Sequence, residues 1–371
     1  MRAVVAEMSV PRYLLTAAGR PSLLTLRDDA PEPALPAGPG WVVLRPELSG
    51  ICGSDVAVAR AKSSLVLSAF YTARRQILGH ETVAVVESTG ERVALDPVLS
   101  CTQRGFTLCR SCREGRPNVC ERQTSPAQGF DAALGGGWGE RLVAHESQLH
   151  PVGAVPSRRA VLAEPASIAL HAAMRWERRG DRAVVIGPGT IGLLLTAALR
   201  RLHPDLDITV IGPGSRAAAM GATRTLPSGP QAVEAFGAVL RPRMTRTPIL
   251  VDGVDVVFDC VASPPTIDLG LHLLRPAGML VLIGSAGKQK VDWSLVWNRQ
   301  LTVQGTVNSA PPVMARVVEW LADPSFPADG LVTHVHELDD WEAALATATA
   351  GARAGAVKVA LRPDPSIPLV T

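Results

Sequence analysis

The sequence is poor in several residue types, and each shortage excludes a class of function. Aromatic residues make up 4% of the 371 residues, with two Tyr and six Phe, so we expect no aromatic cage for a ligand. Only four of the 37 basic residues are lysines, and the 34 acidic residues leave a formal net charge of +3. Neither half of the chain carries a block of like charge, so no nucleic-acid partner and no membrane partner is expected.

Long apolar runs are also missing. No stretch reaches the roughly 18 apolar residues of a membrane span, and Glu7 and Pro11 interrupt the start of the chain, where a secretory peptide needs an unbroken apolar run. We therefore expect a soluble, cytoplasmic protein. A length of 371 residues with 47% hydrophobic content predicts about two domains, each with its own core.

The predicted pattern of secondary structure differs between two parts of the chain. Short β-branched runs over residues 41–51 and 82–98 indicate small antiparallel strands of a barrel-like unit. From about residue 158 strands alternate with helices, which predicts a doubly wound parallel sheet of the α/β class. The expected helices are 160–176, 191–200 and 312–321, and the expected strands are 183–186, 208–211, 254–260, 278–283 and 357–361. The last helix and strand could return to the first domain.

A glycine motif occupies the turn between one predicted strand and the next helix. Residues 184–192 read Val-Val-Ile-Gly-Pro-Gly-Thr-Ile-Gly. In such a Gly-x-Gly-x-x-Gly pattern Gly187 permits the tight turn, Gly189 lets the backbone approach a pyrophosphate and Gly192 allows close helix packing. The helix N-terminus offers unpaired N–H groups to the phosphates. The pattern predicts a dinucleotide site, and a glycine-rich turn without a ligand is the alternative.

The following strand bears on the choice of nucleotide. It ends in Gly-Pro-Gly-Ser-Arg over 212–216, where an NAD site usually has an acid that binds the ribose 2′-hydroxyl. Ser215 and Arg216 can instead hold a 2′-phosphate, because the planar guanidinium matches phosphate oxygens. We expect NADP rather than NAD, the alternative being that Arg216 is a solvated residue opening a short helix. Val261 and Ile283, at the ends of two later strands, are expected around the nicotinamide.

A mixed set of metal-ligating residues lies before the glycine motif. Cys52 in Cys-Gly-Ser-Asp, and His80 and Glu81 in Gly-His-Glu, offer a thiolate, an imidazole and a carboxylate. Such a set suits a catalytic zinc with one exchangeable position. Glu164, in a Glu-Pro step, could supply a carboxylate oxygen as the fourth ligand. Each residue alone has an ordinary structural interpretation, but together, beside a nucleotide loop, they favour a metal site.

Four of the six cysteines lie within twenty residues of one another: Cys101, Cys109, Cys112 and Cys120. Four thiolates complete a tetrahedral zinc site with no room for a substrate, so we expect a structural zinc that fixes a surface loop. A redox dithiol or a disulfide pair is the alternative. Cys260, in an apolar strand, is expected to be a packing residue.

Together these motifs resemble the zinc-dependent alcohol dehydrogenases of the medium-chain dehydrogenase/reductase superfamily, and Gly-His-Glu with Glu-Pro is closest to the polyol and threonine dehydrogenase branch. The resemblance covers nearly the whole chain. It implies a GroES-like catalytic domain over 1–156, to which 306–371 returns, and a Rossmann domain over 157–305. It also implies hydride transfer between NAD(P)(H) and a small alcohol or carbonyl substrate, in a homodimer or homotetramer.

The resemblance also implies roles for single residues. Cys52, His80 and Glu164 would bind the catalytic zinc, and Glu81 would be a neighbouring ligand that exchanges with water or substrate. Ser54 matches the hydroxyl that hydrogen-bonds the reacting oxygen.

Four further residues receive roles in the same way. Asp55 matches the partner of the zinc-bound histidine. Thr190 and Ile191 would lie against the cofactor. Lys358 falls near a basic residue that approaches either the cofactor phosphates or the glutamate after the zinc histidine.

The chain departs from the family pattern at some positions. Ala84 stands where the family usually has Gly, and Cys101 lies eight residues before Cys109 instead of three, which places it on a longer loop. No histidine follows Cys52 closely enough to end a proton relay. Substrate contacts are expected after Asp55, in segment 64–75 with Phe70 and Tyr71, near Trp138 and, if subunits pair, near Trp293 and Trp297.

Three other functions remain open at this point. The same fold could reduce an imine or an activated C=C bond, and such turnover would survive the loss of zinc. A nucleotide-binding protein without catalysis is a second alternative, and the intact Cys52, His80 and Glu81 set argues against it. A zinc-stabilised binding module is a third, and the glycine motif argues against that.

Overall fold

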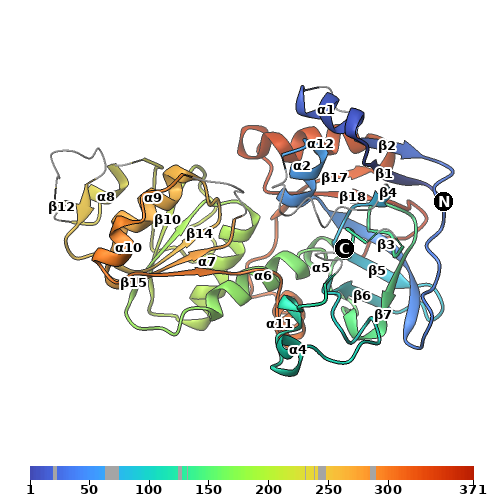
Figure 1. The fold of residues 1–371 in the computed structure, drawn as a ribbon, viewed down its shortest axis with the longest axis horizontal. Helices are drawn as coiled ribbons and strands as arrows, with labels where there is room; N and C mark the ends of the chain where they lie inside the picture. Colours follow the sequence, from blue (N-terminus) through green and yellow to red (C-terminus); the bar gives the residue numbers. More distant parts are fainter. Residues whose placement is uncertain are drawn as a thin grey trace. The chain divides into compact units, whose positions relative to one another are not determined.

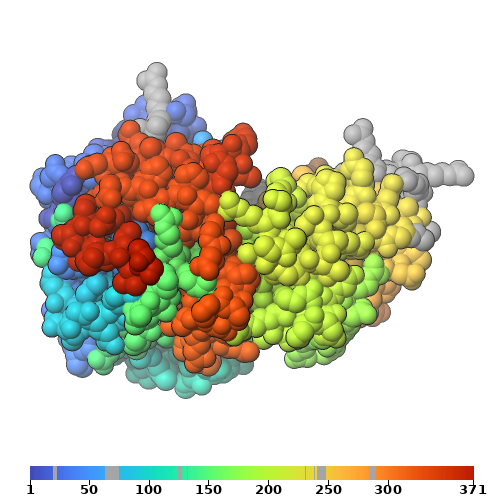
Figure 2. Space-filling view, turned by 180° about the vertical axis from the view of Figure 1, so that it is seen from behind, coloured from blue at the N-terminus to red at the C-terminus, as the bar shows by residue number. Residues whose placement is uncertain are grey.

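The computed structural model describes residues 1–19, 23–62, 75–123, 128–131, 133–229, 231–237, 239–240, 248–284 and 290–371. They form two compact units: unit 1 contains Met1–Ser167 and Asn308–Thr371, and unit 2 contains Ile168–Val307 (Figure 1). The C-terminal segment therefore returns to the N-terminal part of the chain, and Figure 2 shows its red atoms among the blue and cyan atoms of unit 1. No helix in the described ranges is long and apolar enough to cross a membrane.

Unit 1 is built on two sheets of short strands, as its alternating β-branched runs predict. The larger sheet has the order β17-β18-β3-β5-β6-β8, with β7 also paired to β3. Its strands are β3 (Trp41–Gly50), β5 (Glu81–Val86), β6 (Arg92–Leu95), β7 (Leu142–His145), β8 (Leu149–Pro151), β17 (Val332–Glu337) and β18 (Lys358–Arg362). The smaller sheet has the order β2-β1-β4, with β1 (Ala3–Glu7), β2 (Leu24–Arg27) and β4 (Arg75–Ile77).

Short helices connect these strands. They are α1 (Val10–Ala17), α2 (Gly53–Ala59), α4 (Arg110–Arg113), α5 (Ser157–Ala160), α11 (Val313–Ala322) and α12 (Trp341–Ala350), with 3-10 turns η1 (Pro117–Val119), η2 (Glu146–Gln148), η3 (Leu338–Asp340) and η4 (Gly351–Ala354). Helix α6 (Ala163–Met174) begins in unit 1 and ends in unit 2. Because β18 pairs with β3 across more than 300 residues of sequence, the two ends of the chain share one sheet.

Unit 2 contains a six-stranded, wholly parallel sheet with the order β11-β10-β9-β14-β15-β16. Its strands are β9 (Arg182–Ile186), β10 (Asp207–Ile211), β11 (Arg224–Leu226), β14 (Val254–Asp259), β15 (Leu274–Leu282) and β16 (Thr302–Gly305). Its other elements are α7 (Thr190–Leu202), α8 (Gln231–Glu234), α9 (Pro264–Leu273), α10 (Ser294–Asn298) and the pair β12 (Val239–Leu240) and β13 (Ile249–Leu250). Counted from β9, the strand order is 3-2-1-4-5-6, that of the doubly wound dinucleotide fold.

The predicted fold class is confirmed, and the differences are local. The helix expected over 160–176 corresponds to α6, which begins at Ala163, and the separate helix α5 ends at Ala160. The small strands expected within 82–98 are β5 and β6, joined by a turn in which Gly90 has φ +75°. Strand β14 ends at Asp259, so Cys260 follows the strand instead of lying inside it. Apolar periodicity marks where buried elements lie, but a break of a few residues between them depends on local turn geometry.

Candidate functional site

The described part of the chain contains two groups of metal-ligating side chains, and the first lies in unit 1. One ligand atom from each of Cys52, His80 and Glu81 lies within 4.8 Å of the others. Cys52 precedes the first residue of α2, and Glu81 is the first residue of β5. His80 is placed by Gly79, whose φ of +97° and whose close approach to Trp138 leave no room for a Cβ atom.

A carboxylate orients the histidine of this group. Asp55 is fully buried, and its Oδ2 accepts the Cys52 backbone N–H at 2.9 Å. Its Oδ1 lies 3.5 Å from His80 Nδ1, and neither of these two atoms has a hydrogen-bond partner. Burial by itself lowers the pKa of His80, but Asp55 and Cys52 together outweigh it and the pKa lies well above its usual value. An imidazole with Nδ1 toward a carboxylate has Nε2 left for a metal, so the geometry fits zinc.

Glu81 forms a buried ion pair in this unit. Lys358 Nζ lies 2.7 and 2.5 Å from the two Glu81 carboxylate oxygens and 3.1 Å from the Ile51 carbonyl oxygen. Burial lowers the pKa of Lys358, but the acidic groups around it, Glu81 first and then Cys52 and Glu164, more than offset this, so the pKa of Lys358 lies above its ordinary value. Of the two roles that the resemblance allowed, the structure assigns Lys358 to the glutamate, and the expected contact with the cofactor phosphates is corrected because the ammonium is buried against these three acceptors.

Glu164 lies in the first turn of α6 and is buried. Its carboxylate is not part of the three-residue group within 4.8 Å. Burial raises the pKa of Glu164 to about 8, His80 lowers it and Glu81 raises it, so the four side chains share one electrostatic environment. The structure therefore brings together three of the four predicted ligands and places the fourth within electrostatic range.

Two further side chains belong to this part of unit 1. The Ser54 hydroxyl, on α2, is buried and has no hydrogen-bond partner, which fits a group that binds an oxygen of a ligand. The Phe130 ring lies with its centroid 5.2 Å from that of His80. Sequence analysis did not identify Phe130, because no local motif marks it. Trp138, expected near the substrate, is 1% exposed and packs in the core, and of segment 64–75 only Arg75 lies within the described residues.

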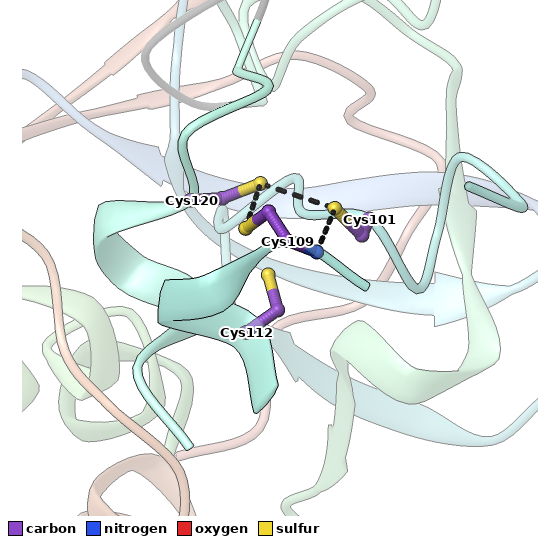
Figure 3. A group of neighbouring side chains, drawn as sticks. All are labelled: Cys101, Cys109, Cys112 and Cys120. Atoms are coloured by element: carbon purple, nitrogen blue, oxygen red, sulfur yellow. Dashed lines mark hydrogen bonds between the residues drawn. The ribbon is translucent and has the colours of Figure 1, made fainter. Parts of the chain in front are cut away.

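The second group is the cysteine cluster, which Figure 3 shows with the side chains of Cys101, Cys109, Cys112 and Cys120 converging. Cys120 Sγ lies 3.6 Å from Cys101 Sγ and 3.9 Å from Cys109 Sγ, and all four thiols are free. The Cys109 backbone N–H donates to Cys101 Sγ at 3.4 Å, so the longer loop still returns to the cluster. The Cys112 backbone N–H lowers the pKa of Cys109 to about 6, while burial raises that of Cys112 to about 12. Four thiolates this close need a cation, and the set fits zinc.

The glycine motif of unit 2 lies between β9 and α7. Gly187 has φ +94°, and a Cβ atom there would meet Val261 at 2.6 Å. At Gly192 it would meet the Gly187 carbonyl oxygen at 2.0 Å. At Gly189 it would meet nothing within 4 Å, so only this glycine borders open space. No acidic residue occupies the first turn of α7, which begins with Thr190 and Ile191, and its N–H groups suit an anion.

The other predicted nucleotide contacts lie at the carboxyl ends of neighbouring strands. Ser215 and Arg216 are exposed in the segment after β10, which forms turns over 216–220 in place of the short helix considered above. Val261 is 45% exposed after β14, and Ile283 is half-buried after β15. Parallel strands bring these ends to one edge of the sheet, where ligands of this fold bind. Burial raises the pKa of Cys260, which fits packing.

Comparison with known proteins identifies the class to which this fold and these sites belong. A model described as "Alcohol dehydrogenase GroES-like domain" matches residues 38–154, and one described as "Zinc-binding dehydrogenase" matches residues 190–323, together more than half of the chain. The cobalt- and zinc-bound thermostable alcohol dehydrogenase from Pyrobaculum aerophilum has the same fold, with a TM-score of 0.76 and 21% identity over 98% of this chain and 99% of that one.

Two similar proteins indicate the branch of the family to which the chain belongs. The chain is 26% identical to D-xylulose reductase A of Aspergillus oryzae over 325 residues, 84% of this chain and 87% of that protein. It is 26% identical to sorbitol dehydrogenase of Halalkalibacterium halodurans over 348 residues, 90% of this chain and 94% of that protein. The chain belongs to the zinc-dependent alcohol dehydrogenase family of the medium-chain dehydrogenase/reductase superfamily, in the polyol and threonine dehydrogenase branch, and is an NAD(P)-dependent oxidoreductase of that family.

Proposed function

We propose that this chain transfers a hydride between NADP(H) and a polyhydroxylated or related secondary alcohol, using a zinc ion held by Cys52, His80 and Glu81. The observation that carries the proposal is the convergence of these three donors. The Ser54 hydroxyl, two residues after Cys52 in the sequence, is buried and unpartnered, which supports it. A bound zinc would supply Lewis acidity that lowers the pKa of the alcohol. The polyol names of the two relatives guide the choice of substrate class.

Each side chain around the proposed metal position would have a separate role. Ser54 would hydrogen-bond the reacting oxygen and take its proton at Oγ while passing its own toward solvent. Asp55 would hold His80 in the tautomer that leaves Nε2 for the metal. Lys358 would keep the Glu81 carboxylate close to the metal position through the ion pair. Glu81 would then alternate between binding the metal and pairing with Lys358 alone as other ligands exchange. Glu164 remains our proposed fourth ligand, supported by its burial and by its electrostatic coupling to His80 and Glu81.

We also propose a separate, structural zinc at the four-cysteine cluster. The support is the closed set of four free thiols on one loop. Because such a site has no position for a substrate, it would contribute to folding and not to hydride transfer.

NADP is proposed over NAD because the segment after β10 offers Ser215 and Arg216 and no carboxylate. Arg216→Ala should weaken NADPH binding about tenfold and leave NADH binding within about twofold, since only NADPH carries the 2′-phosphate. Titrations that follow nicotinamide fluorescence measure both. Equal weakening of the two nucleotides would contradict this account of the 2′-phosphate.

A cytoplasmic homodimer or homotetramer is proposed for the assembled protein. The six free cysteines fit a reducing compartment, and Trp297 on α10 is 75% exposed beside the edge strand β16, which fits a subunit contact. Sedimentation velocity measures the assembly state.

The activity itself is tested with a panel of alcohols and the matching carbonyl compounds. The panel starts with polyols and ketoses and includes 3-hydroxy amino acids, imines and activated alkenes. Absorbance at the NAD(P)H band reports turnover. We expect turnover of a secondary alcohol by the wild type and none by His80→Ala, with the fold retained. Turnover confined to imines or alkenes would contradict the proposed function.

A further inference from the structure

Asp259, the last residue of β14, joins two turns at the carboxyl edge of the unit 2 sheet. Its side chain is 0% exposed. Its Oδ1 accepts the backbone N–H groups of Val261 at 2.9 Å and Ala262 at 2.8 Å. Its carbonyl oxygen accepts those of Ile283 at 3.0 Å and Gly284 at 3.2 Å. One residue therefore fixes the backbone that follows β14 and the backbone that follows β15.

The first of these turns has a backbone conformation that needs such support. Ala262 has φ +52°, in the left-handed region that residues with a Cβ atom rarely adopt. Two consecutive N–H groups that donate to one carboxylate oxygen compensate for that cost. The second turn packs directly on the first, because a Cβ atom at Gly284 would meet the Val261 carbonyl carbon at 2.5 Å. Loss of the carboxylate should therefore release the first turn and disturb the packing of the second, whose own hydrogen bonds to the Asp259 backbone carbonyl remain.

The position of these turns is functional as well as structural. Val261 lies between the glycine motif and the β15 turn, since a Cβ atom at Gly187 would meet its side chain at 2.6 Å. It remains 45% exposed, whereas Asp259 and Ala262 near it in the sequence are buried. Strands β9 and β14 are the neighbours at which the strand order reverses, the place where open α/β sheets bind their ligands.

The carboxylate also carries an unsatisfied oxygen. Asp259 Oδ2 is buried and has no hydrogen-bond partner. A buried orphan oxygen is costly, and a fold that needed only to close this turn could use a smaller polar side chain. Each such group calls for a specific explanation, and a role in the site is one.

We propose that Asp259 is a positioning residue for the nicotinamide: it holds Val261 and Ala262 in the conformation against which the nicotinamide end of the cofactor binds. The inference rests on the proposed function, because it takes unit 2 as the NAD(P) site. It concerns the nicotinamide end alone, since the glycine motif binds the pyrophosphate without contact to the Asp259 carboxylate.

The same strand supplies a matched control. Asp255, at the opposite end of β14, is also buried, and its Oδ2 accepts the N–H groups of Asp181 and Arg182 at 3.0 Å each. Its Oδ1 also accepts from Arg275 at 2.6 Å. Both aspartates therefore accept hydrogen bonds from two backbone N–H groups, but only Asp259 lies at the carboxyl edge of the unit 2 sheet. A purely structural role predicts similar consequences for both.

The test compares Asp259→Ala, Asp255→Ala and wild type in the full chain. Each is titrated with NADPH or NADH, whichever the wild type binds more tightly, and separately with ADP-ribose or its 2′-phosphate, which lack nicotinamide. We expect Asp259→Ala to weaken the complete nucleotide about tenfold and the nicotinamide-free fragment less than about twofold. Asp255→Ala should lower the melting temperature and leave the ratio of the two affinities unchanged.

Asp259→Asn keeps the test decisive if the alanine variant does not fold. Asn retains an acceptor oxygen for both N–H groups but loses the charge, so it should fold and lose about threefold of the preference for the complete nucleotide. An unchanged preference in a folded Asp259 variant overturns the proposal, and so does equal loss of both ligands in the Asp259 and Asp255 variants. A wild type that binds no nucleotide would instead overturn the proposed function.

Discussion

The three glycines between β9 and α7 differ in what surrounds their missing side chains. Gly187 and Gly192 are required by the fold, because a Cβ atom would meet Val261 at the first and a carbonyl oxygen at the second. Gly189 has no atom within 4 Å of that position, and its φ of −79° is open to any residue. A ligand explains a glycine at this position better than the fold does.

Gly189→Ala should therefore separate binding from stability. We expect a melting temperature within a few degrees of wild type and NAD(P)H binding at least about tenfold weaker, because the added methyl group would occupy the space of the pyrophosphate. Gly192→Ala is the control and should destabilise the fold itself. Thermal unfolding and fluorescence titration measure the two effects, and unchanged nucleotide binding in a folded Gly189→Ala protein would contradict the assignment.

Asp96, in unit 1, gives a pH-dependent prediction. Burial raises its pKa from 3.8 to about 6, against the opposing effect of the Val98 N–H, which donates to it at 3.0 Å. The folded protein therefore binds more protons than the unfolded chain between about pH 4 and 6, so this contribution to stability is present at low pH and is lost as the pH rises through 6. Asp96→Asn should stabilise the protein at pH 7.5 by up to about 3 kcal/mol.

That gain should fall to about half at pH 5, where the native carboxyl is mostly protonated. Urea unfolding of the two proteins at both pH values measures the difference, and taking the difference cancels contributions from other titrating groups. A gain that is the same at both pH values would show that Asp96 is not responsible.

At the scale of elements, the local sequence pattern was sufficient to predict the strands whose burial produces a recognisable run of apolar residues. The apolar runs of β9, β10, β14 and β15 were predicted within a few residues, because parallel strands are buried on both faces. The cysteine spacing likewise indicated a closed cluster. The start of α6 was placed three residues too early, because Ala160, Val161 and Leu162 are apolar like the helix that follows them.

Residues 101–120, which carry the four clustered cysteines and are called the cysteine lobe below, should need a bound metal to keep their structure. Cys112→Ser should lose about one zinc per chain together with the lobe's resistance to proteolysis or the assembly of subunits, because three thiolates hold zinc poorly. Cys260→Ser is the control and should keep about two zinc per chain, since Cys260 belongs to neither cluster. Metal analysis and limited proteolysis check both. Normal zinc content in Cys112→Ser would contradict a structural zinc here.

At the scale of the whole molecule, local motifs identified the chemistry, whereas the long-range partner of Lys358 came only from the family resemblance, as one of two possibilities. The family, the two-part architecture and the candidates Cys52, His80 and Glu81, which the structure brings together, followed from motifs a few residues long. The ion pair between Glu81 and Lys358 joins residues 277 apart, and it forms because β18 returns to the sheet of β3. No local pattern carries such information, which is also why Phe130 was missed.

The metal ligands lie in the first unit and the glycine motif in the second, so zinc and nucleotide binding should be separable. This follows from the placement of the donors and does not depend on the substrate.

Removal and return of the catalytic zinc tests the central claim most directly. The protein is treated with a chelator until about one zinc per chain remains, then assayed for turnover of its best alcohol and for NAD(P)H binding, with His80→Ala in parallel. We predict that turnover is lost, that nucleotide binding stays within about twofold, and that added zinc restores turnover in the wild type but not in His80→Ala. Turnover that persists without the catalytic zinc would contradict the account.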